Sequence, residues 1–471
     1  MNKWEKLDKD YIWHPFTQMK GWNENEQLVI ERGEGVKLYD TEGRSYYDGI
    51  SSLWVNIHGH HRPEIDQAIK DQLDQIAHST LLGLINKPSA EFAEKLVEVA
   101  PAGLNKVFYS DDMKQGTLIL LLAVEAAVKI AFQYWQHKGH PEKQGFINLG
   151  DSYHGDTVGA VSVGNIDVFH KVYKPLLFST SKMTCPSFYH NKIKGLASEE
   201  AFLKYCLDEI EAYLKEHADT TAAMIIEPLV QAAAGMLMQP KGYIKGVREL
   251  TRKYDVLLIV DEVATGFGRT GKMWACDNEG ISPDLMTLSK GITGGYLPLG
   301  ATLATDEIYD AFLGEPTEYK TFYHGHSYTG NPLACAAGLA SLEIFKKENV
   351  IANLPPKMDV IAKHMEKMNK MKYVGDARQC GMLAGIELVH DKEKKEPFAA
   401  ELLMAGGICQ ASRKYGLIVR NIGDVIIFMP PLASSNEEIE IMLEKLEQAM
   451  EEVFTKVDSG KQTVFSDPCA F

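Results

Sequence analysis

Short apolar segments that alternate with amphipathic helices constrain the fold of this chain more than any other feature. Residues 222–226 and 256–260 are apolar at every position, and a helical pattern over 241–253 separates them. Strands that are apolar throughout are typical of a mostly parallel sheet that is covered on both faces. The sequence therefore predicts an α/β protein whose central sheet is mostly parallel and has helices on both faces.

The last third of the chain shows a different pattern. Helical periodicity over 332–347 and 357–370 is followed by shorter strand patterns and by an amphipathic helix over 436–455. Strands are predicted at 382–389, 418–421 and 425–430. This part is predicted to form a smaller α+β domain. Earlier in the chain, helices are predicted over 63–76 and 200–217.

The overall charge argues against a nucleic-acid partner. The 471 residues include 49 Lys and Arg against 64 Asp and Glu, a formal net charge of −15, and no basic cluster stands out. Such a chain repels a polyphosphate backbone. The longest apolar run, 118–124, is shorter than the roughly 18–20 residues that cross a bilayer, and the first ten residues contain no apolar signal core. We therefore expect a cytoplasmic protein.

The cysteines and histidines show no metal-site pattern. The seven cysteines are scattered and include no CxxC pair, so we expect reduced thiols that mostly fill the core. His58, His60 and His61 lack the spacing and the Cys or Asp complement of a tetrahedral site. We expect them to be loop histidines, and we expect no metal.

Gly266, Gly268 and Gly271 form a GxGxxG pattern after the strand predicted at 256–260. A dinucleotide-binding turn needs its glycines directly between a strand and a helix. Here Asp-Glu-Val-Ala-Thr intervenes and no helix opening follows, so the pattern does not favour a dehydrogenase. The informative residue is Asp261, a carboxylate at the end of a buried strand, where ligands of such sheets bind. Glu227 stands at the end of the strand predicted at 222–226.

Lys290 has a setting that is unusual for a lysine. Most lysines are solvated surface charges, but Lys290 closely follows the mainly apolar run 283–288 and precedes a glycine-rich turn. Burial at this point would lower its pKa toward the neutral amine that Schiff-base chemistry needs. A strand-end Asp261, Lys290 and glycine-rich turns are the parts of a pyridoxal phosphate site, in which the carboxylate keeps the pyridine nitrogen protonated.

Four segments carry a resemblance to a known family. They are IIEPLVQ (225–231), LLIVDEVATGFGRTG (257–271), PDLMTLSKGITGG (283–295) and HGHSYTGNPLACAA (324–337). With these segments the sequence resembles the class III (ω-amino) aminotransferases of the type I pyridoxal phosphate-dependent transferase fold. The resemblance covers nearly the whole chain.

Within that class, further segments resemble the branch that acts in biotin biosynthesis. They are IWHPFTQM (12–19), DGISSLWVNIHGHHRPEI (48–65) and DSYHGDTVGAVSVG (151–164), together with Ala264 where many relatives have Gln. The resemblance implies transamination of 8-amino-7-oxononanoate to 7,8-diaminononanoate. The amino donor it implies is S-adenosylmethionine, and lysine stays open as an alternative.

The resemblance also implies a role for each candidate residue. Lys290 corresponds to the Schiff-base lysine, Asp261 to the partner of the ring nitrogen, and Tyr153 to the side chain that lies over the ring and contacts substrate. Arg420 corresponds to the residue that binds the substrate carboxylate, a task that suits a bidentate guanidinium. From the residues alone, Arg420 would be a surface charge, Tyr153 could equally be a core residue, and Asp261 could be a helix cap or an ion-pair partner.

The domain organisation and a homodimer follow from the same resemblance. The segment 1–60 is expected to contribute to the small domain and the substrate pocket, 61–331 to form the large cofactor domain and 332–471 the small C-terminal domain. The loop expected to reach the cofactor phosphate from the partner subunit contains Gly325, His326 and Ser327. Of these, His326 and Ser327 are expected to bind cofactor and Gly325 substrate.

The largest departure from the family lies between Ser110 and Glu125. The family has four residues where this chain has eleven, at a helix N-terminus that binds phosphate. Gly116 and Thr117 could still supply a small residue and a hydroxyl for that role. Two explanations stay open, a real insertion and a garbled reading frame.

The predicted substrate pocket departs from the family at two positions. Phe16 stands where many relatives have Tyr, and Leu53, next to Trp54, where many have Trp. All three residues are expected to contact substrate, and the two changes remove hydrogen-bond donors from the pocket wall.

The sequence as a whole predicts a ping-pong transaminase in which Lys290 moves the proton. One alternative is another ω-aminotransferase that acts on ornithine, γ-aminobutyrate or a diamine. A second is a catalytically inactive protein that keeps the fold as a binding module.

Overall fold

The computed structural model describes residues 2–110, 122–191 and 193–459. The chain divides into two compact units. The large unit comprises Pro63–Ile351, and the small unit joins Met1–Arg62 to Ala352–Phe471. Gly116 and Thr117 lie outside the described residues.

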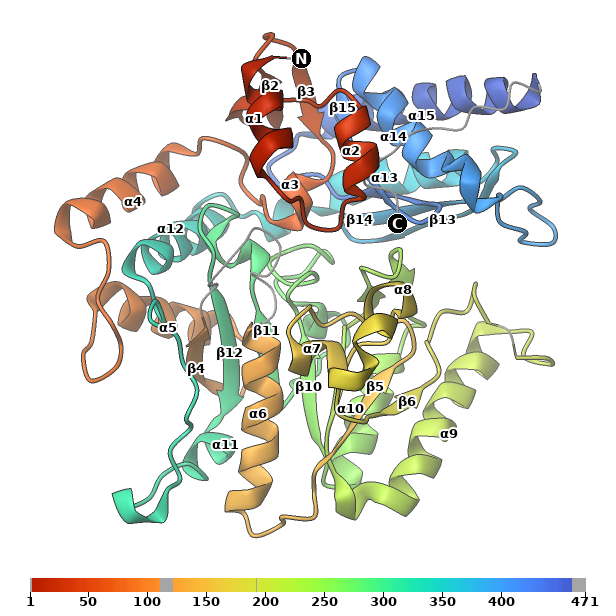
Figure 1. Ribbon diagram of the computed structural model, residues 1–471. Coiled ribbons are helices and arrows are strands. Elements are labelled where there is room, and N and C mark those ends of the chain that lie inside the picture. Colours follow the sequence, from red (N-terminus) through yellow and green to blue (C-terminus); the bar gives the residue numbers. More distant parts are fainter. Residues whose placement is uncertain (1, 111–121, 192, 460–471) are drawn as a thin grey trace. The chain divides into compact units, whose positions relative to one another are not determined.

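The large unit is built on one sheet, which Figure 1 shows. Among the described residues it has seven strands, and only β12 runs antiparallel to the rest, which confirms the mostly parallel sheet that the sequence predicts. In spatial order the strands are β4 (Leu104–Ser110), β12 (Gly300–Thr305), β11 (Leu285–Leu288), β10 (Leu257–Asp261), β7 (Thr221–Ile226), β5 (Gly145–Leu149) and β6 (Ser181–Met183).

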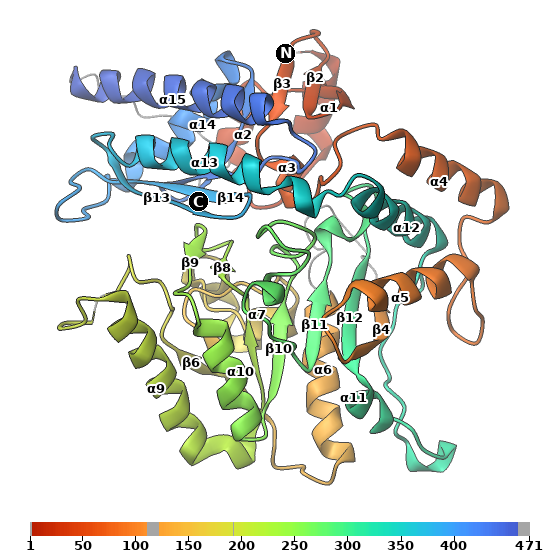
Figure 2. The ribbon, with the colours of Figure 1, turned by 180° about the vertical axis from the view of Figure 1, so that it is seen from behind.

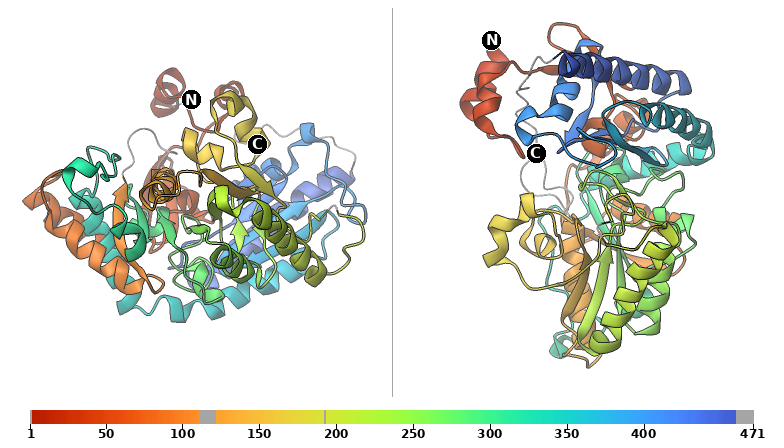
Figure 3. Two further views of the ribbon diagram at one scale, coloured as in Figure 1. Left: turned by 90° about the horizontal axis from the view of Figure 1, so that it is seen from below. Right: turned by 90° about the vertical axis from the view of Figure 1, so that its right-hand side faces the viewer.

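Helices cover both faces of this sheet. In Figure 1 helix α6 lies in front of the strands, and in Figure 2, seen from behind, α9 and α10 lie in front. The edge-on view in Figure 3 (right) shows the same three layers. The helices of the large unit are α4 (Pro63–Gln75), α5 (Lys87–Val99), α6 (Leu122–His137), α7 (Val158–Ser162), α8 (Asp167–His170), α9 (Glu199–His217), α10 (Tyr243–Lys253), α11 (Asp306–Asp310) and α12 (Pro332–Lys347).

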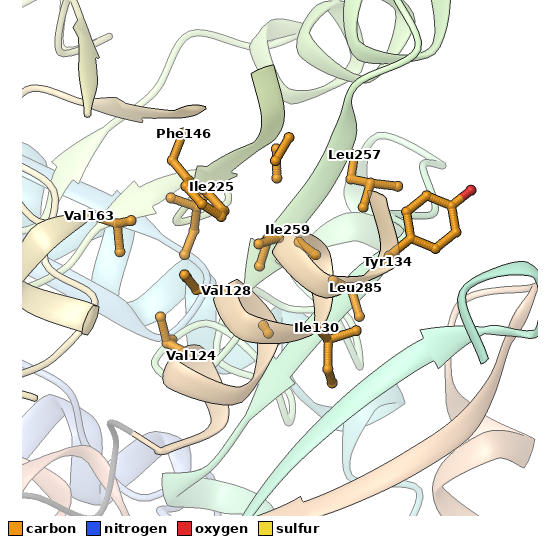
Figure 4. Packing of buried hydrophobic residues seen from close by; sticks show 14 of the residues in the cluster. Val124, Val128, Ile130, Tyr134, Phe146, Val163, Ile225, Leu257, Ile259 and Leu285 are labelled. Atoms are coloured by element: carbon orange, nitrogen blue, oxygen red, sulfur yellow. The ribbon is translucent and has the colours of Figure 1, made fainter. Parts of the chain in front are cut away.

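The core between α6 and the sheet explains why the strands are apolar throughout. Figure 4 shows Val124 and Val128 of α6 packed over Ile225 of β7, Ile259 of β10 and Leu285 of β11. All five side chains are at least nine-tenths buried. Burial of such a side chain contributes about 1.5–3 kcal/mol. Since the other face of the sheet is also covered, a polar residue at either face would lose its water.

Local sequence signals set the helix boundaries. Ser198 is the N-cap residue of α9, and its side chain accepts a hydrogen bond from the backbone N–H of Ala201. Asn331 caps the N-terminus of α12 in the same way. Serine and asparagine are favoured there because they satisfy backbone N–H groups that have no partner within the helix. The helices predicted over 200–217 and 332–347 are therefore confirmed almost to the residue.

Helix α12 belongs to the large unit, whereas the sequence analysis places it in the C-terminal domain. It packs against α4 and α5. A Cβ atom on Gly338 would lie only 2.4 Å from Cζ of Phe92, so glycine is what lets α12 and α5 approach. The boundary between the units consequently falls after Ile351 and not after residue 331.

The small unit contains two four-stranded sheets among its described residues. One has the order β13 (Val374–Cys380), β14 (Leu383–Leu388), β17 (Val425–Phe428) and β16 (Arg420–Ile422), and all its pairs are antiparallel. Its helices are α13 (Pro355–Met368), α14 (Met404–Lys414) and α15 (Asn436–Asp458). This agrees with the predicted α+β character, although β13 and α14 were not predicted.

The second sheet joins the two ends of the chain. Its order is β1 (Ile30–Glu34), β2 (Lys37–Asp40), β3 (Ser45–Asp48) and β15 (Leu417–Ile418). Tyr47 of β3 pairs in parallel with Leu417 of β15. Two short helices, α1 (Lys3–Tyr11) and α2 (Met19–Glu24), precede these strands.

A left-handed turn, α3 (Ser51–Trp54), follows β3. Its four residues have φ of 51°, 47°, 69° and 71°, and none is glycine. A left-handed helical conformation costs about 1–2 kcal/mol per L-residue. Contacts in the folded unit must therefore hold this turn in place.

The described residues contain no helix that is long and apolar enough to cross a membrane, and no group of three or more His, Cys, Asp and Glu that could hold a metal ion. Cys206, Cys276, Cys335 and Cys409 are buried, as expected for cysteines that fill the core.

Candidate active site

Asp261 ends β10 with both carboxylate oxygens engaged. The Nδ1 atom of His154 donates to Oδ2 at 2.8 Å. The backbone N–H of Val263 and the hydroxyl of Thr287 donate to Oδ1, each at 3.1 Å. Asp261 is 5% exposed and His154 2%. Because both oxygens of the carboxylate accept hydrogen bonds from fixed donors, its direction is fixed.

Lys290 lies beside Asp261 because their strands are neighbours. Strands β10 and β11 are parallel, and Asp261 pairs with Thr287, three residues before Lys290. Lys290 has φ of 46°, begins the 3-10 helix η5 (Lys290–Thr293), and is 6% exposed. Burial lowers the pKa of Lys290 to about 8, against the opposing charges of Asp261 and Glu227. About a tenth of the amine is thus neutral at pH 7.

Tyr153 follows β5 and is held at both ends. Its backbone N–H donates to Oε2 of Glu227 at 3.1 Å, and its hydroxyl donates to Oδ2 of Asp156 at 2.8 Å. Its ring lies nearly parallel to that of His170, with 6.1 Å between centroids and 11° between planes. Burial raises the pKa of the Tyr153 hydroxyl far above its usual range. The residue therefore stays a neutral hydrogen-bond donor.

Glu227 is a second buried carboxylate at this edge of the sheet. It follows β7 and accepts hydrogen bonds from the backbone N–H groups of Tyr153 and Ala232 at 3.1 and 2.9 Å. Burial raises the pKa of Glu227 to about 7. The carboxyl ends of β5, β7, β10 and β11 thus bring Tyr153, Glu227, Asp261 and Lys290 into one cluster.

Sequence reasoning assigned no role to three residues of this cluster. Glu227 was identified only as a strand-end acid, and His154 and Asp156 were not singled out. Their signal was nonetheless present, since both occur in the SYHGDT segment beside Tyr153. His154 contacts Asp261, 107 residues further along the chain, and that contact depends on the strand order.

The loop with Gly325, His326 and Ser327 precedes α12 in the large unit. Gly325 and Ser327 are exposed, and His326 is partly buried. The backbone N–H of His326 donates to the Thr329 hydroxyl at 2.9 Å, and the rings of His324 and His326 lie 5.2 Å apart. The loop therefore has an ordered local structure while two of these three residues face away from the core.

The remaining predicted substrate residues belong to the small unit. Leu53 and Trp54 lie on the left-handed turn, Phe16 lies between α1 and α2, and Arg420 begins β16. Phe16, Leu53 and Arg420 are partly buried, and Trp54 is 9% exposed. The predicted site residues are thus contributed by both units.

A parallel-sheet edge that carries a buried lysine beside a strand-end aspartate defines the class of protein. The sequence profile described as aminotransferase class-III matches residues 19–450, and the chain belongs to this family. The family and the α/β architecture predicted from the sequence are therefore confirmed.

Individual relatives are similar over nearly their whole length. Adenosylmethionine-8-amino-7-oxononanoate aminotransferase of Geobacter sulfurreducens is 50% identical over 446 residues, 95% of this chain and 97% of that protein. The Aquifex aeolicus protein of the same name is 51% identical over 453 residues, 96% of this chain and 98% of that protein.

Solved structures give the same result. The crystal structure of the enzyme of that name from Methanocaldococcus jannaschii superposes with a TM-score of 0.89 at 47% identity. The match covers 95% of this chain and 98% of the Methanocaldococcus chain. The ω-transaminase of Pseudomonas jessenii in complex with PMP has a TM-score of 0.91 at 30% identity, and the match covers 98% of this chain and 100% of the Pseudomonas chain.

Proposed function

We propose that this protein is the pyridoxal phosphate-dependent aminotransferase that converts 8-amino-7-oxononanoate to 7,8-diaminononanoate in biotin biosynthesis, with S-adenosylmethionine as amino donor. The observation that carries the proposal is the identity of about half of all residues, over at least 95% of the chain, to proteins of that name. The buried Lys290 beside Asp261 supports the chemistry.

The residues at the sheet edge fit the cofactor. Asp261 offers a buried carboxylate for the protonated ring nitrogen, and Lys290 offers an amine for the aldehyde. Within the part of the chain that the structure describes, the buried Nε2 atom of His154 has no hydrogen-bond partner, which leaves it available to a bound group. When bound, pyridoxal phosphate supplies an electron sink that makes a proton of the substrate carbon labile.

Lys290 would then move that proton with Nζ. Its lowered pKa of about 8 keeps part of the amine neutral and able to accept a proton near neutral pH. The tether of the side chain replaces a bimolecular proton transfer with an intramolecular one. The hydrogen bond to Glu227 would keep Tyr153 over the ring, and His154 would keep Asp261 oriented toward its nitrogen.

Recognition of the keto substrate is assigned to the small unit. Arg420 would bind the substrate carboxylate through two parallel hydrogen bonds. Phe16, Leu53 and Trp54 would line the apolar carbon chain. Many relatives have Tyr and Trp where this chain has Phe16 and Leu53. Because these changes alter the pocket wall, lysine stays the alternative amino donor.

We also propose a homodimer in which Gly325, His326 and Ser327 reach the partner subunit's cofactor. The exposure of Gly325 and Ser327 supports this. Large apolar side chains are exposed in the same unit, as expected of a surface that another chain covers: Leu82, Leu84, Ile85, Tyr319, Tyr323 and Tyr328. A cytoplasmic location remains a prediction from the sequence.

Two measurements test the proposal. The purified protein should show a visible cofactor band that borohydride bleaches, and it should form 7,8-diaminononanoate from 8-amino-7-oxononanoate with adenosylmethionine. Turnover with lysine alone would change the assigned donor. Faster amino transfer from ornithine or γ-aminobutyrate would contradict the assigned substrate, and a protein without the band would support the inactive alternative.

A further inference from the structure

The left-handed turn Ser51–Trp54 needs anchors that ordinary turns do not. Each of its four residues is in a backbone region that L-residues avoid, and no glycine relieves the cost. Such a conformation persists only where surrounding contacts determine it. The turn carries Leu53 and Trp54, two of the three apolar side chains proposed to line the substrate.

Asp48 provides the first anchor. It is fully buried at the end of β3, and its backbone N–H donates to the carbonyl of Val36 at 2.9 Å. Its Oδ1 accepts from the backbone N–H of Ser52, and its Oδ2 from the hydroxyl of Ser52, both at 2.8 Å. The carboxylate thus holds the second residue of the turn through two charge-assisted hydrogen bonds.

His60 fixes the direction of this carboxylate. Its Nε2 contacts Oδ2 of Asp48 at 2.9 Å, and its backbone pairs with Gly35 in both directions. A Cβ atom on Gly33 would lie 2.6 Å from Cγ of His60, so the absence of a side chain there makes room for the imidazole. The ring is therefore held by its backbone and by the space that Gly33 leaves.

The first residue of the turn is anchored to the C-terminal part of the small unit. The hydroxyl of Ser51 donates to the carbonyl of Met429 at 2.6 Å, and the N–H of Met429 donates to the carbonyl of Gly49 at 2.8 Å. Both anchors lie within one unit. The direction of Leu53 and Trp54 thus depends on residues that do not themselves belong to the proposed pocket.

We propose that Asp48, oriented by His60, is a positioning residue for substrate selectivity: it holds the left-handed turn that presents Leu53 and Trp54 to the carbon chain of the keto substrate. The inference rests on the proposed function, because that function assigns the two apolar residues to the substrate. Loss of the anchor should weaken binding of the substrate chain and leave the cofactor in the large unit undisturbed.

Asp48→Ala tests the inference against a matched control, Asp40→Ala. Asp40 is 2% exposed in the neighbouring strand β2 and accepts hydrogen bonds from Arg44 and Tyr46, whose positions lie outside the turn. In the holoenzyme we expect Asp48→Ala to raise KM for 8-amino-7-oxononanoate at least about tenfold, with kcat changed much less. Asp40→Ala should keep KM near the wild-type value even if it lowers the melting temperature.

Asp48→Asn should restore most of the affinity, because its amide oxygen can accept from the Ser52 N–H while its nitrogen donates to the Ser52 hydroxyl. If Asp48→Ala does not fold, His60→Ala tests the inference instead, and it should raise KM less than Asp48→Ala would. Arg44→Ala, which removes the partner of Asp40, is its control. All variants should keep the wild-type visible spectrum and cofactor content.

An unchanged KM in Asp48→Ala, or an equal rise in Asp40→Ala, would overturn the positioning role. The wild-type assay separates this result from the proposed function. A wild-type holoenzyme that does not convert 8-amino-7-oxononanoate contradicts the proposed function, whereas an active wild type with unaffected Asp48 variants contradicts only this inference.

Discussion

The imidazole of His154 donates from Nδ1 to Oδ2 of Asp261 over 2.8 Å, and both side chains are almost completely buried. The pair joins the segment after β5 to the end of β10, although 107 residues separate its members in the sequence. It orients the carboxylate to which we assign the cofactor's ring nitrogen, so its removal should be visible in catalysis.

His154→Ala should lower kcat/KM by about 10–100-fold, by analogy with the loss found when the hydrogen-bond partner of a metal-binding residue is removed. The cofactor spectrum should shift as well, because Asp261 loses the hydrogen bond from Nδ1 of His154 that orients its carboxylate. His364→Ala is the matched control: His364 is 4% exposed and contacts Glu447 through Nδ1, also at 2.8 Å, but it lies in the small unit. Full activity in His154→Ala would contradict the role assigned to the pair.

Lys290→Ala should abolish turnover while the protein remains folded. The assay is steady-state transamination together with borohydride treatment, which should no longer attach the cofactor covalently. Lys143→Ala is a suitable control, because Lys143 is also a buried lysine whose pKa is lowered by burial, but its Nζ donates to the backbone carbonyl of Asp255 at 2.5 Å. Substantial turnover in Lys290→Ala would exclude the assignment.

The buried amine of Lys290 should also make the stability of the apoprotein depend on pH. The lysine has an ordinary pKa of 10.5 and a folded pKa of about 8, so the unfolded chain holds more protons between these values and stability rises with pH across that window. Below pH 8 the folded state carries the full penalty. Lys290→Met should therefore stabilise the apoprotein at pH 7 by up to about 3 kcal/mol, with the difference vanishing toward pH 10.5. Urea unfolding at several pH values measures it.

An ionic cluster around the buried Glu447 joins α13 to α15 in the small unit. Glu447 contacts Nδ1 of His364 and Nζ of Lys367, and these hydrogen bonds lower the pKa of Glu447 against the effect of burial. Glu447→Gln removes the buried carboxylate that accepts from His364 and Lys367, although Glu440 still lies 3.3 Å from Nε2 of His364, and should cost about 1.5–3 kcal/mol of unfolding free energy at pH 7. Glu444→Gln, at an exposed position of α15, should change little. Equal losses in the two variants would exclude a specific role for the cluster.

The close approach of α12 to α5 predicts a clash that a second mutation relieves. Gly338→Ala places a Cβ atom 2.4 Å from Cζ of Phe92 and should destabilise the protein by about 1–3 kcal/mol. The double variant Gly338→Ala/Phe92→Leu should lose less unfolding free energy than the sum of the losses of the two single variants, because the smaller side chain at position 92 leaves room for the methyl group. Thermal unfolding measures these losses. Strictly additive changes in unfolding free energy would show that the two helices do not meet at this point.

Strands β7, β10 and β11 and the residues that follow or end them could be predicted, because burial on both faces leaves a direct trace in the sequence, whereas β4, β5, β6 and β12 were not predicted. Asp261, Glu227 and Lys290 interrupt apolar runs, and a charged residue in that position stands out. The partners of Asp261 and Tyr153 could not be predicted in the same way. Whether His154 faces Asp261 depends on the order of strands in the sheet, which hydrophobic periodicity does not contain.

The missed elements have their own physical reasons. Helix α14 contains Gly406 and Gly407, which weaken a helical pattern, and β13 is interrupted by polar residues such as Asp376 and Arg378. Helix α12 was found at its observed bounds but assigned to the wrong unit, since periodicity shows that a helix has an apolar face and not which neighbour covers it. The left-handed turn at Ser51–Trp54 has no glycine to announce it.

The pairing of β3 with β15 also has a consequence for how the chain is made. Domains usually fold in the order in which the ribosome releases them, at about 5–20 residues per second. Here all residues of the large unit have been synthesised before residue 352, whereas β3 waits for a partner that begins at Leu417, a delay of roughly 20–70 s at those rates. The edge of β3 that pairs with β15 therefore stays open during this time, and an open strand edge is a template for pairing with another chain.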